Sequence, residues 1–171
     1  MIDTAIILAA GLGKRMREFD PVIPKPLIKV KNKPFIQYAI DLLNEIRAKK
    51  IVINVHYKSD EILKFIKNLS QNNIIVSDES DLLLDTGGGI KKIFDKYNIN
   101  KSLVLNSDVI WSDSDKELIV DMINSYPKEA EAFIGLVPKK NIRGFKGKGD
   151  FCILKNNNLI RYDASSEPYV Y

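Results

Sequence analysis

The sequence predicts an α/β fold, a Rossmann-like and mostly parallel sheet sandwiched by helices, and three observations support this. Short, continuous apolar segments of strand length alternate with longer segments whose apolar residues recur at helical spacing. The alternation repeats four times, and right-handed crossovers turn such a series into a parallel sheet covered by helices. The length of 171 residues suits a single domain, which we expect to span residues 1–171.

The strands are predicted from apolar runs that are bounded by polar residues. Continuous apolar character, as opposed to alternation, is typical of parallel strands that are buried on both faces. The predicted strands are residues 4–9, 27–30, 51–55, 74–76 and 102–105.

Amphipathic stripes predict the helices between these strands. Pro34 suits the first position of one helix, and Ser59 is expected to cap the next. The three glycines at 87–89 are expected to form a turn that precedes a helix. The predicted helices are residues 34–49, 59–69, 90–97 and 115–126.

The character of the chain changes beyond Pro127. Apolar segments with Gly- and Asn-rich connections predict strands at residues 131–137, 150–154, 159–162 and 169–171. We expect these strands to form a small antiparallel extension at the C-terminal end, closing one side of the site.

Charge is separated along the chain. Residues 14–33 hold seven basic side chains against two acidic ones, and residues 108–121 hold five acidic side chains against Lys116. This separation favours a site for an anionic ligand and a cation over a nucleic-acid-binding face, which needs one broad basic surface. Solvated surfaces of a Lys- and Asn-rich protein remain the alternative interpretation of the same charges.

Two features of the sequence indicate the cellular compartment. The single cysteine, Cys152, cannot form an internal disulfide, which fits a reducing environment. The longest apolar run, residues 5–10, is six residues long, which is too short for a membrane span or a signal-peptide core. We therefore expect a cytoplasmic protein without a membrane partner.

The turn after the first strand has the composition of a phosphate-binding loop. Gly11 and Gly13 allow the backbone N–H groups to approach a polyanion closely, and Lys14 and Arg15 supply compensating charge. Lys25 follows between two prolines. A dinucleotide fingerprint is excluded because Met16 stands where its third glycine is needed, and a G-x-x-x-x-G-K-[ST] element is absent from the sequence.

A carboxylate follows another predicted strand. Asp108 comes after residues 102–105, through Asn106 and Ser107, and is well placed for Mg²⁺, which takes one or two carboxylates together with substrate oxygens. Because ligands bind beyond the carboxyl ends of parallel strands, residues 10–25, 85–89 and 106–108 are expected to share one rim. The alternative is that Asp108 simply begins a turn.

Motifs that follow one another in register along the chain resemble those of a known family. LAAGLGKRM followed by PKPLIKVKNKPFIQYAIDLL, then DTGGGI, NSDVIW and KGDF, resemble the sugar-1-phosphate nucleotidyltransferases over the whole chain. The TGGGI turn and the N-x-D-V stretch are most similar to the bacterial N-acetylmuramate-1-phosphate uridylyltransferases. The resemblance implies a fold of the nucleotide-diphospho-sugar transferase type.

The resemblance also implies an activity. By this resemblance, a nucleoside triphosphate and a sugar 1-phosphate react to give a nucleotide sugar and pyrophosphate, with Mg²⁺ as cofactor. The most similar subgroup implies UTP and N-acetylmuramate 1-phosphate as the two substrates. Such chemistry needs positioning and electrostatic stabilisation more than a protein nucleophile. The implied partners are these two substrates, with no nucleic acid and no membrane, and the oligomeric state is not determined.

Residue roles follow from the same resemblance. Gly11 and Gly13 contact the nucleotide, Lys14 and Arg15 neutralise the leaving pyrophosphate, and Lys25 bridges the α-phosphate and the sugar phosphate. The catalytic set is Arg15, Lys25 and Asp108, with Asp108 as metal ligand. The nucleotide-binding set adds Thr86, Gly87 and Gly88, and the sugar-phosphate set is Asn106, Gly149 and Asp150.

For several of these residues, an interpretation without a functional role stays open. Lys25 also fits an ordinary surface lysine, residues 86–88 a plain helix-entry turn, and Asp150 a carboxylate at the end of a loop.

Two departures from the family pattern lead to a second hypothesis. Glu18 and Asp20 stand in a stretch where the family usually has Pro-Leu-Thr, which predicts weaker triphosphate binding because they add negative charge beside an anion site. The chain ends at Tyr171, before the family segment that supplies a second metal-binding carboxylate. One alternative is therefore a truncated, catalytically impaired nucleotide-binding module. Another, based on the same basic loop, is a guanylyl- or cytidylyltransferase acting on mannose 1-phosphate or an alcohol phosphate.

Overall fold

A computed structural model describes residues 2–14, 22–155, 158–164 and 166–171. The chain divides into two compact units, Met1–Val120 and Asp121–Tyr171, which are described separately. The expectation of a single domain over residues 1–171 stays a prediction.

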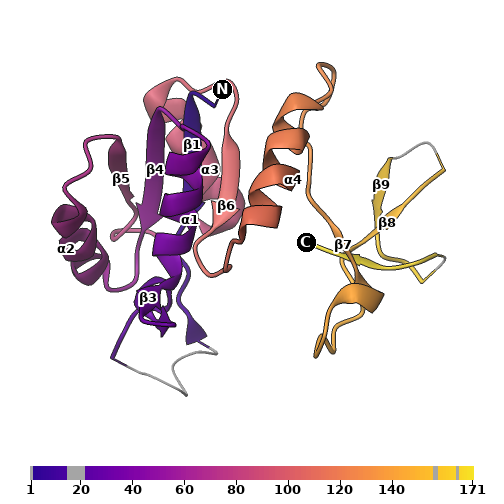
Figure 1. The fold of residues 1–171 in the computed structure, drawn as a ribbon, viewed down its shortest axis with the longest axis horizontal. Helices are drawn as coiled ribbons and strands as arrows, with labels where there is room; N and C mark the ends of the chain where they lie inside the picture. The colour runs from indigo at the N-terminus through magenta and orange to yellow at the C-terminus, as the bar shows by residue number, and fades with distance from the viewer. Residues whose placement is uncertain (1, 15–21, 156–157, 165) are drawn as a thin grey trace. The chain divides into compact units, whose positions relative to one another are not determined.

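The first unit is built on a four-stranded sheet in which every pair is parallel (Figure 1). Its order is β5 (Ile74–Asp78), β4 (Lys50–Val55), β1 (Thr4–Leu8) and β6 (Leu103–Asn106). Leu8 pairs with Asn54 on one side and with Asn106 on the other. Because parallel strands end at the same edge, this register brings three chain segments to one rim.

Both faces of this sheet are buried, as continuous apolar strands require. Ile6 and Val52 form a core cluster with Ile93 of α3 (Asp85–Tyr97). The alternate side chains Ile7 and Ile53 are fully buried on the other face, where α1 (Phe35–Glu45) packs against β1. Helix α2 (Ser59–Leu69) contacts β5, and α4 (Asp113–Asn124) follows β6.

A short hairpin lies between the first strand and α1. It consists of β2 (Lys29–Val30) and β3 (Lys33–Pro34), which pair antiparallel, and follows the 3-10 helix η2 (Lys25–Leu27). The strand expected at residues 27–30 is therefore shorter than predicted, because residues 25–27 form a helical turn that carries Lys25.

The second unit contains a small antiparallel sheet in the order β7-β10-β8-β9. Its elements are β7 (Val137–Pro138), η3 (Lys139–Asn141), β8 (Phe151–Ile153), β9 (Leu159–Arg161) and β10 (Tyr169–Val170). The predicted antiparallel extension is confirmed. The strand expected at 131–137 is wrong except for Val137, where pairing with β10 begins.

Three predictions at helix ends are wrong. Pro34 is not the first helical residue, because its backbone is extended, with ψ 146°, and α1 begins at Phe35. Residues 87–89 are not a turn before a helix, because α3 already begins at Asp85 and includes all three glycines. Ser59 does not cap α2. The residue before this helix is Lys58, whose backbone is left-handed, with φ 52°, and Ser59 is the first helical residue. Among the described residues, no helix combines the length and the apolar character that crossing a bilayer requires.

Candidate active site

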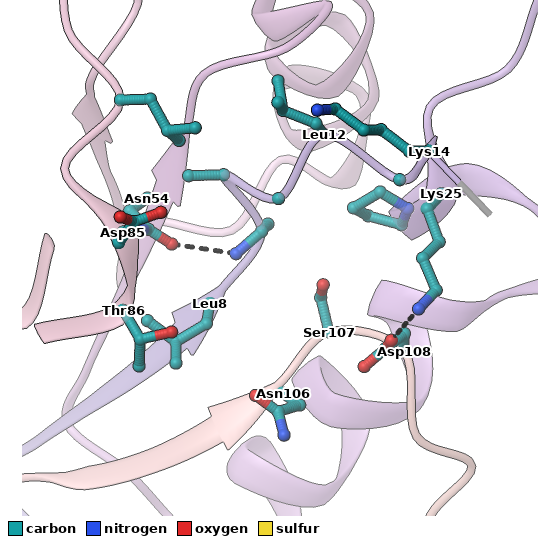
Figure 2. A pocket seen from close by; sticks show the side chains of 16 residues that line it. Leu8, Leu12, Lys14, Lys25, Asn54, Asp85, Thr86, Asn106, Ser107 and Asp108 are labelled. Atoms are coloured by element: carbon teal, nitrogen blue, oxygen red, sulfur yellow. Dashed lines mark hydrogen bonds and ion pairs between the residues drawn. The ribbon is translucent and has the colours of Figure 1, made fainter. Parts of the chain in front are cut away.

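A pocket of about 420 Å³ lies at the carboxyl ends of the parallel strands in the first unit (Figure 2). Segments that are distant in sequence form its walls, namely the loop after β1, the turn η2, the end of β4, the start of α3 and the end of β6. The lining residues are Leu8, Ala9, Ala10, Gly11, Leu12, Gly13, Lys14, Lys25, Pro26, Asn54, Leu83, Asp85, Thr86, Asn106, Ser107 and Asp108. The shared rim expected from the sequence is therefore present.

The loop after β1 brings backbone to the pocket, and its two glycines differ in what they need. Gly13 has a φ of +59°, and a Cβ there would lie 3.2 Å from the Cβ of Lys25, so both the backbone conformation and the packing favour glycine. Gly11 has ordinary backbone geometry, and a Cβ there would meet no atom within 4 Å. Among the residues that the structure describes, nothing accounts for a glycine at position 11.

Lys25 is held on the pocket wall by the 3-10 turn η2. The backbone N–H of Leu27 donates to the carbonyl of Pro24 at 2.8 Å, and Pro24 and Pro26 are both buried. Since proline fixes φ, the segment that carries the lysine is restricted. The Nζ of Lys25 donates to the carboxylate Oδ2 of Asp108 in an ion pair, and Figure 2 shows the two side chains pointing toward one another.

Asp108 reaches this position because β6 ends two residues earlier. The backbone N–H of Ser107 donates to the carbonyl of Leu8 at 3.2 Å, which extends the pairing of β6 and β1 past the last strand residue. Asn106 lies level with Leu8 and also lines the pocket. The side chains of Lys25 and Asp108 are 29% and 31% exposed, so both groups remain accessible to a ligand.

The start of α3 forms another wall of the pocket. Asp85 and Thr86 line it, whereas Gly87 and Gly88 follow within the first turn of the helix and are not lining residues. The first N–H groups of a helix have no partner within the helix and favour anions. The glycines thus lie within the start of α3 beside the pocket, and the plain helix-entry turn is wrong for their conformation because they are already helical.

The remaining predicted site residues that the structure describes are divided between the pocket and the second unit. Lys14 lines the pocket, and Arg15 lies outside the described residues. Gly149 and Asp150 belong to the second unit. There the φ of Gly149 is +115°, a Cβ at this position would lie 2.6 Å from the Cβ of Pro168, and Oδ2 of Asp150 accepts the backbone N–H of Tyr171 at 3.1 Å. Both residues thus have structural partners in their own unit.

Sequence reasoning missed two polar residues at this edge of the sheet. Asn54 lines the pocket although it is only 2% exposed, and Glu79, just after β5, is 1% exposed and hydrogen-bonded to it. The signal was available for Asn54, since it is the one polar side chain in the apolar run 51–55. Glu79 gave no signal because it stands among other acidic residues.

The oxygen groups of the pocket fit a hard divalent cation such as Mg²⁺. Asp108 offers a carboxylate beside Asn106, and Asp85 offers another on the opposite side of the view (Figure 2). Across the described residues, no three His, Cys, Asp or Glu side chains gather into a group that could hold a metal alone. The donor set therefore suits an ion that also takes oxygens from a bound phosphate.

The parallel sheet, the glycine loop and the paired lysine and aspartate together define an α/β protein with a site for a polyanion. The sequence model of the family described as nucleotidyl transferase matches residues 4–146. The chain belongs to this family, and its resemblance to the sugar-1-phosphate nucleotidyltransferases is confirmed.

Individual relatives agree with this family. The chain is 30% identical to an N-acetylmuramate alpha-1-phosphate uridylyltransferase of Caulobacter vibrioides over 98% of its own length and 72% of the relative. It is 29% identical to a D-glycero-alpha-D-manno-heptose 1-phosphate guanylyltransferase of Aneurinibacillus thermoaerophilus, over 82% of its own length and 60% of the relative. Its length thus spans roughly two thirds of these proteins.

A solved structure supports the fold. The crystal structure of HddC from Yersinia pseudotuberculosis superimposes with a TM-score of 0.67 at 23% identity, covering 99% of this chain and 73% of the other. The predicted nucleotide-diphospho-sugar transferase type of fold is confirmed.

Proposed function

We propose that this chain catalyses nucleotidyl transfer from a nucleoside triphosphate to a sugar 1-phosphate. The observation that carries the proposal is the ion pair of Lys25 and Asp108, which lies in the pocket beside the glycine loop at the carboxyl ends of the strands. A cation and a carboxylate at one place are what a metal-bound triphosphate needs, since it presents both negative oxygens and a positive ion.

The proposed reaction is an in-line displacement at the α-phosphorus. A phosphate oxygen of the sugar 1-phosphate forms a bond to the α-phosphorus, while the bond from that phosphorus to the oxygen bridging to the β-phosphate breaks and pyrophosphate leaves. The attacking oxygen is already ionised at neutral pH, so no general base is required. The protein contributes position and charge.

The residues of the pocket divide this work. The backbone N–H groups at Gly11 and Gly13 and Thr86 at the start of α3 contact the nucleotide. For Gly87 and Gly88, which do not line the pocket, the same role rests on sequence resemblance alone. Lys14 and Arg15 neutralise the charge that accumulates on the leaving pyrophosphate. Lys25 leaves Asp108 and bridges the α-phosphate and the incoming phosphate, where the charge of the transition state develops.

Asp108 is the proposed metal ligand. When bound, Mg²⁺ neutralises negative charge between the two phosphate groups and helps to orient them. In this structure the ammonium group of Lys25 pairs with the carboxylate of Asp108. The carboxylate and the lysine therefore exchange partners when the substrate arrives.

The substrates are proposed from the relatives. The match to the Caulobacter vibrioides uridylyltransferase favours UTP and N-acetylmuramate 1-phosphate, since it covers 98% of this chain. A guanylyltransferase acting on a sugar 1-phosphate is the second candidate, favoured by the Aneurinibacillus thermoaerophilus relative. Asn106, Gly149 and Asp150 are proposed to contact the sugar phosphate, and for the last two this role rests on sequence resemblance alone.

Pyrophosphate release over a panel of triphosphates and sugar 1-phosphates tests the proposal. We expect release only when both substrates and Mg²⁺ are present, and we expect Asp108→Asn to abolish it while the protein still folds. Asp113→Asn is the matched control, because Asp113 is an exposed carboxylate at the start of α4 and does not line the pocket.

Three results separate the hypotheses. Release with one pair of substrates supports the enzyme and identifies its base and its sugar. Triphosphate binding without release for any pair supports the impaired nucleotide-binding module. A near-normal rate for Asp108→Asn would remove Asp108 from the metal site.

A further inference from the structure

A buried polar chain connects the glycine loop to two other elements at the rim. The backbone N–H of Ala9, the first residue after β1, donates to Oδ1 of Asn54 at 2.8 Å. The amide Nδ2 of Asn54 then donates to Oε1 of Glu79 at 3.0 Å. A backbone N–H can only donate, so the order of donors and acceptors along the chain is fixed.

The first turn of α3 packs directly on this pair. A Cβ at Gly89 would lie 2.8 Å from Nδ2 of Asn54 and 2.8 Å from Oε1 of Glu79. These contacts are too short for a side chain, so the glycine lets the helix approach the hydrogen bond closely. One asparagine and one glutamate thereby join the ends of β1 and β4 to the start of α3.

The backbone of Glu79 is fixed as well. Its N–H donates to the carbonyl of Val55 at 2.8 Å, and the Nδ1 of His56 lies 2.6 Å from its carbonyl oxygen. The preceding Asp78 accepts both the hydroxyl and the backbone N–H of Ser80, and these bonds lower the pKa of the Asp78 carboxyl. These bonds fix the point from which the side chain of Glu79 extends toward Asn54.

Stability alone does not explain a carboxylate at this place. Glu79 is 1% exposed, and its Oε2 has no hydrogen-bond partner among the residues that the structure describes. A buried polar group that is only partly satisfied costs stability, and an apolar side chain of similar size avoids that cost. What the glutamate provides at this position is an acceptor for the hydrogen bond from Asn54.

We propose that Asn54 and Glu79 are positioning residues for the triphosphate. Glu79 orients the side-chain amide of Asn54, and Asn54 in turn fixes the backbone of Ala9. Because the loop continues from Ala9, this fixed start directs the backbone N–H groups of residues 10–13 into the pocket. The proposal rests on the proposed function for the identity of the ligand. It adds a structural reason why that loop is formed before the ligand binds.

Reversing the polarity of the hydrogen bond tests this inference. Asn54→Asp keeps the acceptor for Ala9 but places a carboxylate against Glu79, and we expect the dissociation constant for the Mg²⁺–triphosphate to rise roughly tenfold or more. Adding Glu79→Gln restores a donor on the other side, and the double variant is expected to regain most of the affinity. Asn44→Asp is the matched control, since Asn44 donates to Gln71 at 3.1 Å outside the pocket.

A second pair of variants covers the possibility that Asn54→Asp does not fold. Glu79→Gln keeps an acceptor for Asn54, whereas Glu79→Met has a similar size, removes the acceptor and adds no charge. We expect Glu79→Met to raise the KM for the triphosphate much more than the KM for the sugar phosphate, with Glu79→Gln close to the unchanged protein. Hydrogen exchange of the Ala9 amide is expected to be faster in Glu79→Met than in Glu79→Gln.

The outcomes are distinct. Normal triphosphate affinity in both Asn54→Asp and Glu79→Met overturns the inference, and so does an unchanged exchange rate at Ala9. A loss of thermal stability with unchanged affinity assigns these residues a structural role only, which also overturns it. If the unchanged protein binds no triphosphate, the proposed function fails, while the exchange rate at Ala9 still decides whether Glu79 acts on the loop.

Discussion

Lys25 and Asp108 are 83 residues apart in sequence and meet because each lies at the carboxyl edge of the same sheet. Their ion pair has a consequence for metal binding. A metal ion that approaches the free protein has to compete with an ammonium group for the carboxylate, whereas a metal that arrives with a triphosphate brings the oxygens that Lys25 prefers. Binding of metal and nucleotide should therefore be coupled.

Lys25→Met tests this coupling. The variant keeps the apolar stem and removes the charge, so we expect tighter binding of Mn²⁺ to the nucleotide-free protein, measured by electron paramagnetic resonance. We also expect kcat to fall by roughly 10²–10³-fold, as for the loss of one group that stabilises transition-state charge. Lys33→Met is the control, because Lys33 forms a comparable ion pair with Asp41 away from the pocket. Unchanged metal binding and turnover would contradict the exchange of partners.

Gly11→Ala distinguishes a glycine kept for the fold from one kept for a ligand. The added methyl meets no atom of the described residues within 4 Å, so the unfolding temperature should not fall. A triphosphate lying against this backbone would meet the methyl, and we expect roughly tenfold weaker binding by calorimetry. Gly135→Ala, whose Cβ would make only an ordinary contact of 3.8 Å with Met122, should change neither quantity. Full affinity in Gly11→Ala places the ligand elsewhere.

At the scale of elements, the sequence predicted what depends on local pattern. The apolar runs identified β1, β4, β5 and β6, and the helical stripes identified α1 to α4, because periodicity reports burial directly. The start of α3 was missed, since a run of three glycines is typical of a turn and gives no helical signal. Gly89 packs closely on Asn54 and Glu79, and we attribute the early start of the helix to this tertiary contact.

The glycines of α3 provide a matched pair for testing that explanation. Gly87→Ala adds a methyl that meets nothing within 4 Å, so it should raise the free energy of unfolding by up to about 1 kcal/mol through helix propensity. Gly89→Ala makes the same change but pushes into the Asn54–Glu79 hydrogen bond, and we expect it to lower the free energy of unfolding. Urea denaturation measures both values. Equal effects of the two substitutions would show that the close packing at Gly89 is unimportant.

At the scale of the whole molecule, most of the candidate site comes from the first unit. Lys14, Lys25, Asn106 and Asp108 line its pocket, and the sequence could place them together because the fold class fixes which strand ends share an edge. The sequence could not reveal Asn54 and Glu79 as a pair, since their contact depends on the register of β4 and β5. Gly149 and Asp150 lie in the second unit, where their proposed role stays a prediction.

Asp150→Asn tests the division of labour between the two substrates. Removing one charge is expected to raise the KM for the sugar 1-phosphate and to leave the KM for the triphosphate unchanged, in steady-state assays of pyrophosphate release. Glu167→Gln is the control from the same unit, because Glu167 pairs with Lys140 at 2.8 Å and raises the pKa of that lysine. If Asp150→Asn lowers thermal stability without changing either KM, its bond to Tyr171 is its whole role.

The proposed function requires that the loop after β1, Lys25 and Asp108 together bind a metal-bound triphosphate. Chemical-shift mapping of the backbone amides during titration with a non-hydrolysable UTP analogue and Mg²⁺ tests it most directly. We predict the largest shifts at residues 9–13, at Lys25 and at Asp108, with little change at Asn44 and Gln71. Shifts centred on Asn44 and Gln71, or none at saturating ligand, would contradict it.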